Sequence, residues 1–203
     1  MDIGVLGGTF DPVHIAHLVI AQEAHSQLRL ERVLFAPARQ PWHKPKREPS
    51  PIDDRVALVR LAIAGDSRFE LSLADAEREG PTYTVDTLRR LGERFPEARL
   101  YFIVGGDSLV ELPTWREPQR IVRMCRLAVA LRPGQTVDLD ALEREVPGVS
   151  AAVVLLDVPQ MGVSSSDIRR RVAEGRPIRY LAPERVEAYI RERGLYRDGA
   201  SET

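Results

Sequence analysis

The sequence predicts an α/β fold in which an open, mostly parallel β-sheet carries helices on both faces. Apolar runs of strand length alternate with helical segments along the 203 residues. The first strand, helix and second strand also fall within about 35 residues, the length of one parallel crossover unit. We therefore expect a doubly wound sheet with right-handed crossovers and a small helical carboxyl end.

Six runs of strand length define the expected sheet. Most are rich in Val, Leu, Ile and Phe, which suits strands buried on both faces, and the third alternates apolar and polar residues. The expected strands are Ile3 to Leu6, Arg32 to Ala36, Phe69 to Leu73, Leu100 to Val104, Leu127 to Leu131 and Ala152 to Leu156.

Helical segments separate these runs. Asp53 or Asp54 is expected to cap the second helix, and Gly65 to end it. The first two expected helices are Val13 to Leu28 and a segment from Asp53 or Asp54 through Ala64. A third starts at Thr82 or Thr84 and has Val85, Leu88, Leu91 and Phe95 on its apolar face. The others are Val137 to Val146, Ile168 to Gly175 and a last helix through Arg193.

Length and composition fit one globular domain. The chain is long enough for one sizeable core and short for two, so we expect a single domain over residues 1–203 with its helical carboxyl part at about 164–196. Hydrophobic residues make up 43% and charged residues 29% of the chain. These values argue against extended disorder.

The net charge and the cysteine content limit which partners and which cellular compartment the sequence predicts. The formal net charge of −1 gives no global attraction to nucleic acid or to an anionic membrane. Cys125 is the only cysteine, and apolar runs such as Ala151 to Leu156 are far too short to span a bilayer. The sequence therefore predicts a cytoplasmic protein that binds neither nucleic acid nor membrane, and it is compatible with a homo-oligomer.

The segment from Gly7 to His17 has the properties of a phosphate-binding turn. It joins the first strand to the first helix, where two glycines allow close backbone approach and free helix amides attract an anion. His14 and His17 are three residues apart and are expected to project to one side, where imidazoles can donate to phosphate oxygens. A metal pair lacks a third ligand, and GxGxxG is absent, but a plain buried helix start remains an alternative.

At these residues the sequence resembles the nucleotidyltransferases with the (H/T)xGH pattern, and specifically the nicotinate-nucleotide adenylyltransferase branch that opens with GGTFDPxHxGH. Ala16 replaces the family's glycine and adds one methyl group beside the nucleotide. The resemblance implies a Rossmann-like fold. It also implies an ATP site that includes Gly7, Gly8, Thr9 and Phe10 with His14 and His17.

A basic, proline-rich segment runs from Pro37 to Pro51 and cannot be regular structure. It holds both lysines of the chain, Lys44 and Lys46. It is either a solvated linker or a mobile lid over the triphosphate, and we favour the lid because long irregular loops tend to be functional. Pro41-Trp42-His43-Lys44 resembles the family's loop motif of two prolines followed by His-Lys, which gives Lys44 a catalytic role.

Two further regions resemble the family's acceptor site and sheet edge. Thr82 to Leu88 is similar to (S/T)YTxDTL, in which the backbone around Tyr83 and Thr84 meets the pyridine carboxylate, and Trp115 takes the place of an aromatic against the pyridine ring. Gly105 would leave room for the nucleotide at the sheet edge. Asp107 is either a ribose-hydroxyl acceptor or the cap of the next helix, and Arg132 can reach a phosphate from the end of its strand.

Val163 to Arg169 resembles the family's ISSTxIR signature. Taken alone, it is a serine-capped surface helix. Within the family pattern, Ser165, Ser166 and the catalytic Arg169 form a second cradle for the β and γ phosphates. The segments Pro177 to Pro183 and Gly194 to Tyr196 resemble the carboxyl-terminal close of the nicotinate-nucleotide branch.

Together these motifs imply transfer of AMP from ATP to nicotinate mononucleotide, with Mg²⁺ carried by ATP and no protein-bound metal. The alternatives are a sibling transferase acting on nicotinamide mononucleotide or phosphopantetheine, a non-catalytic nucleotide sensor on the same fold and, more remotely, an NAD-dependent oxidoreductase. The interpretation requires the histidine turn and the serine–arginine turn to converge in space.

Overall fold

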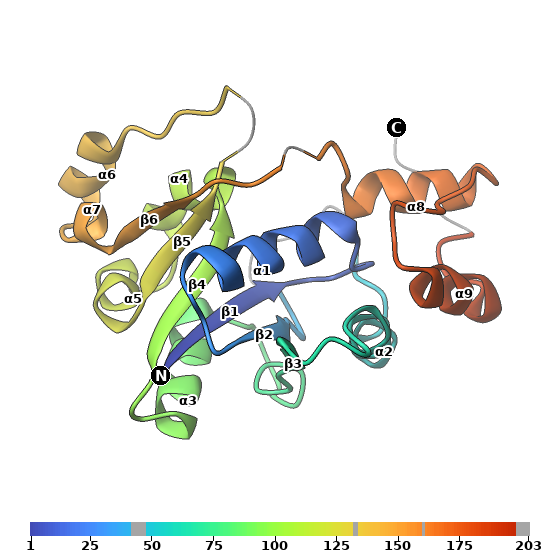
Figure 1. The fold of residues 1–203 in the computed structure, drawn as a ribbon, viewed down its shortest axis with the longest axis horizontal. Helices are drawn as coiled ribbons and strands as arrows, with labels where there is room; N and C mark the ends of the chain where they lie inside the picture. Colours follow the sequence, from blue (N-terminus) through green and yellow to red (C-terminus); the bar gives the residue numbers. More distant parts are fainter. Residues whose placement is uncertain (42–47, 132–133, 160, 198–203) are drawn as a thin grey trace.

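The computed structural model describes residues 1–41, 48–131, 134–159 and 161–197. Six strands form one sheet in the order β3-β2-β1-β4-β5-β6, and every adjacent pair is parallel. The strands are β1 (Asp2–Gly8), β2 (Arg32–Pro37), β3 (Phe69–Leu71), β4 (Arg99–Gly105), β5 (Arg126–Ala130) and β6 (Val153–Leu156). The order reverses between β1 and β4, as in a doubly wound fold, so the predicted Rossmann-like class is confirmed (Figure 1).

The connections between the strands are mostly helical. The helices are α1 (Ile15–Gln27), α2 (Ile52–Ala62), α3 (Thr84–Arg94), α4 (Gly106–Val110), α5 (Pro118–Met124), α6 (Leu139–Glu145), α7 (Val149–Ala152), α8 (Ser165–Ala173) and α9 (Glu184–Arg193), with a 3₁₀ turn, η1 (Leu112–Thr114). None of these helices is long and apolar enough to cross a bilayer, within the part of the chain that the structure describes.

The two faces of the sheet bury two separate apolar clusters. On β1, Leu6 belongs to the cluster under α1, α2, α8 and α9, whereas Val5 belongs to the cluster under α3 and α5. This alternation follows from the two-residue period of a strand. Ile168 of α8 and Ile190 of α9 join the first cluster, so the carboxyl-terminal helices pack on the sheet side that also carries α1 and α2 (Figure 1).

Some predicted helix ends were wrong. Neither Asp53 nor Asp54 caps α2, because Pro51 occupies the N-cap position and both acids lie in the first turn. Asp54 is instead buried and accepts hydrogen bonds from Tyr189 Oη at 2.8 Å and Arg193 Nε at 3.3 Å. Asp54, which the sequence pattern predicts as a helix cap, therefore links α2 to α9 by hydrogen bonds.

Short elements account for most of the other differences. The sequence pattern did not predict α4, α5, α7 or η1, each of seven residues or fewer, since so short a segment shows little periodicity. The third strand ends two residues early, at Leu71, and the sixth begins at Val153 because Ala152 completes α7. The predicted helix at Val137 to Val146 is confirmed as α6.

Candidate nucleotide-binding and active site

A cavity of about 670 Å³ opens at the carboxyl ends of β1, β4 and β5. Its walls include sequence-predicted residues from five separate segments of the chain. The predicted site residues that line it are Gly7, Gly8, Thr9, His14, His17, Thr84, Gly105, Trp115 and Ser165. The carboxyl edge of the sheet is therefore where these motifs meet, as the fold class requires.

The glycines at the end of β1 allow close packing beneath the cavity. A Cβ atom on Gly7 would lie 3.1 Å from the Phe102 ring, and one on Gly8 would lie 3.2 Å from the Phe10 ring. Phe10 is itself buried and packs edge-on against His17, with ring centroids 5.1 Å apart. Phe10 therefore supports the histidine turn from below and does not line the cavity.

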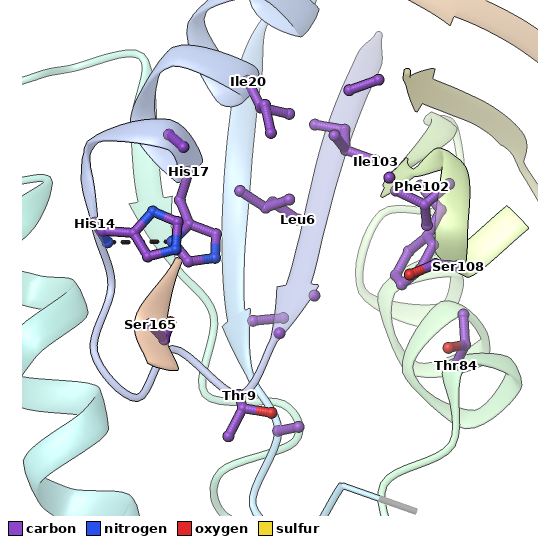
Figure 2. Close-up of a pocket in the computed structure, with 18 of the residues that line it drawn as sticks. Leu6, Thr9, His14, His17, Ile20, Thr84, Phe102, Ile103, Ser108 and Ser165 are labelled. Carbon is purple, nitrogen blue, oxygen red and sulfur yellow. Dashed lines mark hydrogen bonds between the residues drawn. The ribbon is translucent and has the colours of Figure 1, made fainter. Parts of the chain in front are cut away.

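The two histidines face each other at the start of α1. His14 is the N-cap residue, so the helix begins at Ile15, two residues later than predicted. The imidazole centroids are 3.8 Å apart, and the His14 backbone N–H donates to His17 Nδ1 at 3.1 Å (Figure 2). Because Nδ1 of His17 is an acceptor, the neutral ring carries its proton on Nε2 and can donate from there.

Burial keeps both imidazoles neutral. Burial lowers the pKa of His14 to about 4, and burial together with the neighbouring His14 lowers the pKa of His17 well below its usual value. Nδ1 of His14 is buried without a hydrogen-bond partner among the described residues. A buried polar atom of this kind is typical of a site that a ligand completes.

The serine turn meets the histidine turn directly. Ser165 Oγ donates to the Pro12 carbonyl at 2.8 Å, and Arg169 Nη1 donates to the Asp11 carbonyl at 2.7 Å. The first contact joins residues 153 positions apart in the sequence, and the second joins residues 158 positions apart. Figure 2 shows Ser165 beside the two histidines. The convergence that the sequence interpretation required is therefore present in the fold.

Several predicted ATP residues lie outside the cavity lining. Arg169 donates to the Asp11 carbonyl, and the exposed Ser166 shares a 3.1 Å hydrogen bond with Ser164 Oγ. Asp107 is not the cap of α4, because Gly105 holds that position, and its carboxylate accepts from Gln135 Nε2 at 2.8 Å. Their roles in binding ATP stay predictions.

Two predicted cations, Lys44 and Arg132, lie outside the described residues. The same holds for the His-Lys part of the proline-rich loop motif. Among the described residues no group of three or more His, Cys, Asp and Glu side chains is placed to hold a metal ion.

The start of α3 and Trp115 form the far side of the cavity. Thr84 is the first residue of α3 and lines the cavity, and Tyr83 is its N-cap, with the Arg116 guanidinium 4.7 Å from the Tyr83 ring centroid. The Trp115 ring stands perpendicular to Phe102, with centroids 6.1 Å apart. Figure 2 places Thr84 and Ser108 across the view from His14, His17 and Ser165.

Sequence reasoning missed a polar cluster on this side. Asp75, Thr82, Thr87 and Ser108 all line the cavity. Asp75 is 4% exposed, and Thr87 Oγ1 donates to its carboxylate at 2.8 Å. A single acid in a loop carries no sequence signal of burial. The helical spacing did predict that Val85 and Leu88 would be buried, and Thr87 lies between them.

Sequence reasoning also missed Arg55, which is 1% exposed and among the largest fully buried side chains. Its guanidinium donates to the carbonyls of Thr9 at 2.9 Å, Ala38 at 2.6 Å, Arg39 at 2.8 Å and Ser50 at 2.8 Å. Burial lowers the pKa of Arg55, an effect that the nearby carboxylate of Asp11 opposes. Arg55 thus joins the chain segments that follow β1 and β2.

Asp11 connects this framework to the carboxyl-terminal segment. Its Oδ1 accepts from Tyr196 Oη at 2.8 Å, and its Oδ2 accepts from the Ser50 backbone N–H at 3.2 Å. Burial, followed by the charge of Asp11, raises the pKa of Tyr196. The histidine turn is therefore held from three sides by Arg55, Arg169 and Tyr196.

Comparison with known proteins agrees with this geometry. The profile of the family described as cytidylyltransferase-like matches residues 5–171. A protein of Thermomicrobium roseum, named probable nicotinate-nucleotide adenylyltransferase, is 50% identical over 96% of this chain and 91% of its own length. A Roseiflexus protein of the same name is 46% identical over 96% and 98%. The solved structure of Plasmodium falciparum nicotinic acid mononucleotide adenylyltransferase complexed with NaAD superposes with a TM-score of 0.77, covering 96% and 97% at 21% identity, a likeness of fold.

Proposed function

Since this chain belongs to the cytidylyltransferase-like family, and within it to the nicotinate-nucleotide adenylyltransferases, we propose that it transfers AMP from ATP to nicotinate mononucleotide. The products are nicotinate adenine dinucleotide and pyrophosphate, so the enzyme is a nucleotidyltransferase of NAD biosynthesis. The observation that carries the proposal is the convergence of the histidine turn with the serine turn on one cavity at the sheet edge.

The reaction needs positioning and charge stabilisation more than proton transfer. A phosphate oxygen of the mononucleotide attacks the α-phosphorus of ATP in line. A new P–O bond forms, and the bond between the α-phosphorus and the oxygen that bridges to the β-phosphorus breaks. The attacking phosphate is already an anion at neutral pH, so no general base is required. Mg²⁺ carried by the triphosphate supplies charge neutralisation.

His14 and His17 are suited to stabilise the charge that develops on the α and β phosphates. Both rings are neutral at pH 7, so each offers one N–H donor without repelling Mg²⁺. His17 Nε2–H is the fixed donor, because the backbone N–H of His14 holds Nδ1. Donors preorganised in a buried site cost little reorganisation as the charge builds.

The serine side is expected to hold the triphosphate tail. Ser165 lines the cavity, and the 9-residue helix α8 presents its free amides beside it. Ser166 and Arg169 remain proposed ATP contacts that need a side-chain rearrangement, since both are now turned to protein partners. Lys44 and Arg132 remain proposed cations for the same phosphates.

The far side of the cavity fits the acceptor. The amino end of α3 offers free amides for the pyridine carboxylate, with the hydroxyl of Thr84 at the same turn. Trp115 offers a ring face to the pyridine. This assignment puts the ATP phosphates on the histidine side of the cavity and the mononucleotide on its far side.

We also propose a single domain and a cytoplasmic location. Ile168 of α8 and Val186 of α9 share one buried cluster with sheet residues, which supports one folding unit. The lone cysteine is buried, consistent with a reducing compartment.

A parallel acceptor assay tests the function. ATP and Mg²⁺ are incubated with nicotinate mononucleotide, nicotinamide mononucleotide or phosphopantetheine, and pyrophosphate is followed. We expect the fastest release with nicotinate mononucleotide. Faster release with phosphopantetheine would identify the sibling transferase, and ATP binding without pyrophosphate release from any acceptor would identify a nucleotide sensor.

A further inference from the structure

The turn that carries the two histidines has little regular structure of its own. Residues 9–14 lie between β1 and α1 and belong to neither element. Contacts from the carboxyl-terminal part of the chain hold this turn. Ser165 Oγ donates to the Pro12 carbonyl at 2.8 Å, and the Ile15 backbone N–H donates to the Leu181 carbonyl at 3.0 Å. The positions of the histidines are thus set largely by segments that pack against the turn.

Tyr196 reaches the same turn from the segment after α9. The helix ends at Gly194, which has a left-handed conformation with a φ of 65°. Tyr196 is left-handed as well, with a φ of 66°, a conformation that residues other than glycine rarely adopt. Its ring is 8% exposed and belongs to the same buried cluster as Phe10 and Val13. Packing therefore holds the ring in place despite an unfavourable backbone conformation.

The hydroxyl of Tyr196 contacts Asp11, three residues before His14. Tyr196 Oη lies 2.8 Å from Asp11 Oδ1, and the Asp11 side chain is buried. Burial raises the pKa of Tyr196, and the charge of Asp11 adds to this rise, so the hydroxyl keeps its proton and donates. Asp11 Oδ2 accepts from the Ser50 backbone N–H at 3.2 Å, so the carboxylate is held at both oxygens. Buried hydrogen bonds to a carboxylate are among the stronger kinds.

We infer that Tyr196 is a positioning residue for AMP transfer, whose hydroxyl fixes the two histidines by holding Asp11. This inference rests on the proposed function. Asp11 and His14 belong to one turn, and the His14 backbone N–H donates to His17 Nδ1 at 3.1 Å. A shift of the backbone at Asp11 therefore moves both imidazoles and disturbs the bond that leaves His17 Nε2 as the donor.

This role predicts a larger effect on kcat than on KM. Stabilisation of developing charge needs donors at the place where the charge appears, and a displacement of about 1 Å can cost roughly a hundredfold in rate. Binding of the ground state draws on many other groups along the cavity wall, so it should change less.

The test is Tyr196→Phe, which keeps the ring and removes only the hydroxyl. We expect kcat to fall by about tenfold, and the KM values for ATP and for nicotinate mononucleotide to change by less than about twofold. Circular dichroism at the assay temperature serves to show that the variant is folded. A kcat equal to that of the wild type, or a rise in KM alone, would overturn the inference.

Tyr189→Phe is the matched control. Tyr189 Oη also donates to a buried carboxylate at 2.8 Å, that of Asp54. Asp54 lies in α2, however, and not in the histidine turn. Tyr189→Phe removes the same kind of bond and should leave kcat within about twofold of the wild type. An equal fall in kcat in both variants would show that loosening the carboxyl-terminal helices is sufficient, and Tyr196 would have no specific role.

A double variant tests the route through Asp11. Asp11→Ala removes the acceptor of the Tyr196 hydroxyl, so the addition of Tyr196→Phe should lower kcat no further. A further tenfold fall in the double variant would mean that Tyr196 acts by another route, which contradicts the inference.

Amide hydrogen exchange keeps the inference separate from the proposed function. The His14 backbone amide reports on the bond to His17, and NMR measures its exchange rate without substrate. We expect this rate to rise by roughly tenfold in Tyr196→Phe and to stay at the wild-type value in Tyr189→Phe. An unchanged rate in Tyr196→Phe would overturn the inference even if pyrophosphate release confirms the transferase. If the rate rises but the wild type releases no pyrophosphate with any acceptor, the proposed function fails and the hold of Tyr196 on the histidine turn stands.

Discussion

The two sides of the cavity are built in different ways. The histidine side is assembled from distant segments, with contacts such as Arg169 to Asp11 and Tyr196 to Asp11 that join residues 158 and 185 positions apart. On the acceptor side the contact of Thr87 with Asp75 spans only 12 positions, although Trp115 on the same side comes from a later segment. The histidine turn is therefore positioned by contacts from across the fold, whereas Asp75 is positioned by a helix turn that lies close to it in the sequence.

The two sides also differ in charge. Among the described residues the histidine side presents neutral imidazoles whose pKa values are lowered, and the acceptor side presents a carboxyl whose pKa is raised. Burial causes both shifts, because it penalises the charged form of either group. Burial thus favours the neutral form of the titratable groups on both sides of the cavity.

The largest expected effect comes from breaking the framework of the histidine side. Arg55→Met keeps the volume but leaves four backbone carbonyls without their donor, and buried acceptors of this kind are costly. We expect the free energy of unfolding to fall by about 3 kcal/mol or more. Urea denaturation measures it. Arg60→Met, at an exposed position of the same helix, should change the free energy of unfolding little. Equal losses in the two variants would show that the hydrogen bonds of Arg55 do not stabilise the fold.

The next largest effect is expected on catalysis, in a variant that leaves the framework of the histidine side intact. His17→Ala removes a fixed donor and is expected to lower kcat by about a hundredfold or more, the scale of one preorganised charge stabiliser. The circular dichroism spectrum and melting temperature serve to show that the fold is retained. His25→Ala, on the same helix and away from the cavity lining, is the matched control. Wild-type turnover in His17→Ala would remove His17 from the mechanism.

The sequence was most informative where its pattern is regular. Alternating strands and helices predicted the sheet, and the glycine-rich turn with two histidines predicted the cavity edge, because backbone approach and helix amides are local properties. The meeting of that turn with Ser165 could be inferred only from the joint resemblance of both motifs to one family. No local pattern relates residues so far apart.

The residues that escaped prediction share one physical cause. Arg55 and Asp75 are charged, and charged residues are almost never fully buried unless they are paired. Their burial depends on partners that the chain brings from elsewhere: four carbonyls for Arg55, and the hydroxyl of Thr87 for Asp75. Conversely, Arg169 and Ser166 were assigned to phosphate by the resemblance to the family signature, and the fold uses both for protein contacts.

A smaller effect is expected on the acceptor side. Trp115→Ala should raise the KM for nicotinate mononucleotide by roughly tenfold, the loss of one aromatic stacking partner, and raise the KM for ATP less. Initial rates at saturating concentrations of the other substrate measure both constants. Trp115→Phe retains a ring against Phe102 and should recover most of the affinity. An effect on ATP alone would mean that Trp115 faces the nucleotide.

The smallest effect distinguishes two neighbouring serines on the histidine side. Ser165 Oγ lines the cavity and donates to Pro12, so Ser165→Ala should lower kcat/KM for ATP by about fivefold, the worth of one hydrogen bond. Ser166 is exposed and hydrogen-bonds to the Ser164 hydroxyl, and it would reach ATP only after its side chain rearranges, so Ser166→Ala should have a smaller effect than Ser165→Ala. The resemblance alone assigns both serines to phosphate. A loss in Ser166→Ala as large as that in Ser165→Ala would show that α8 reorganises when ATP binds, and that the contact between the two turns is only the resting arrangement.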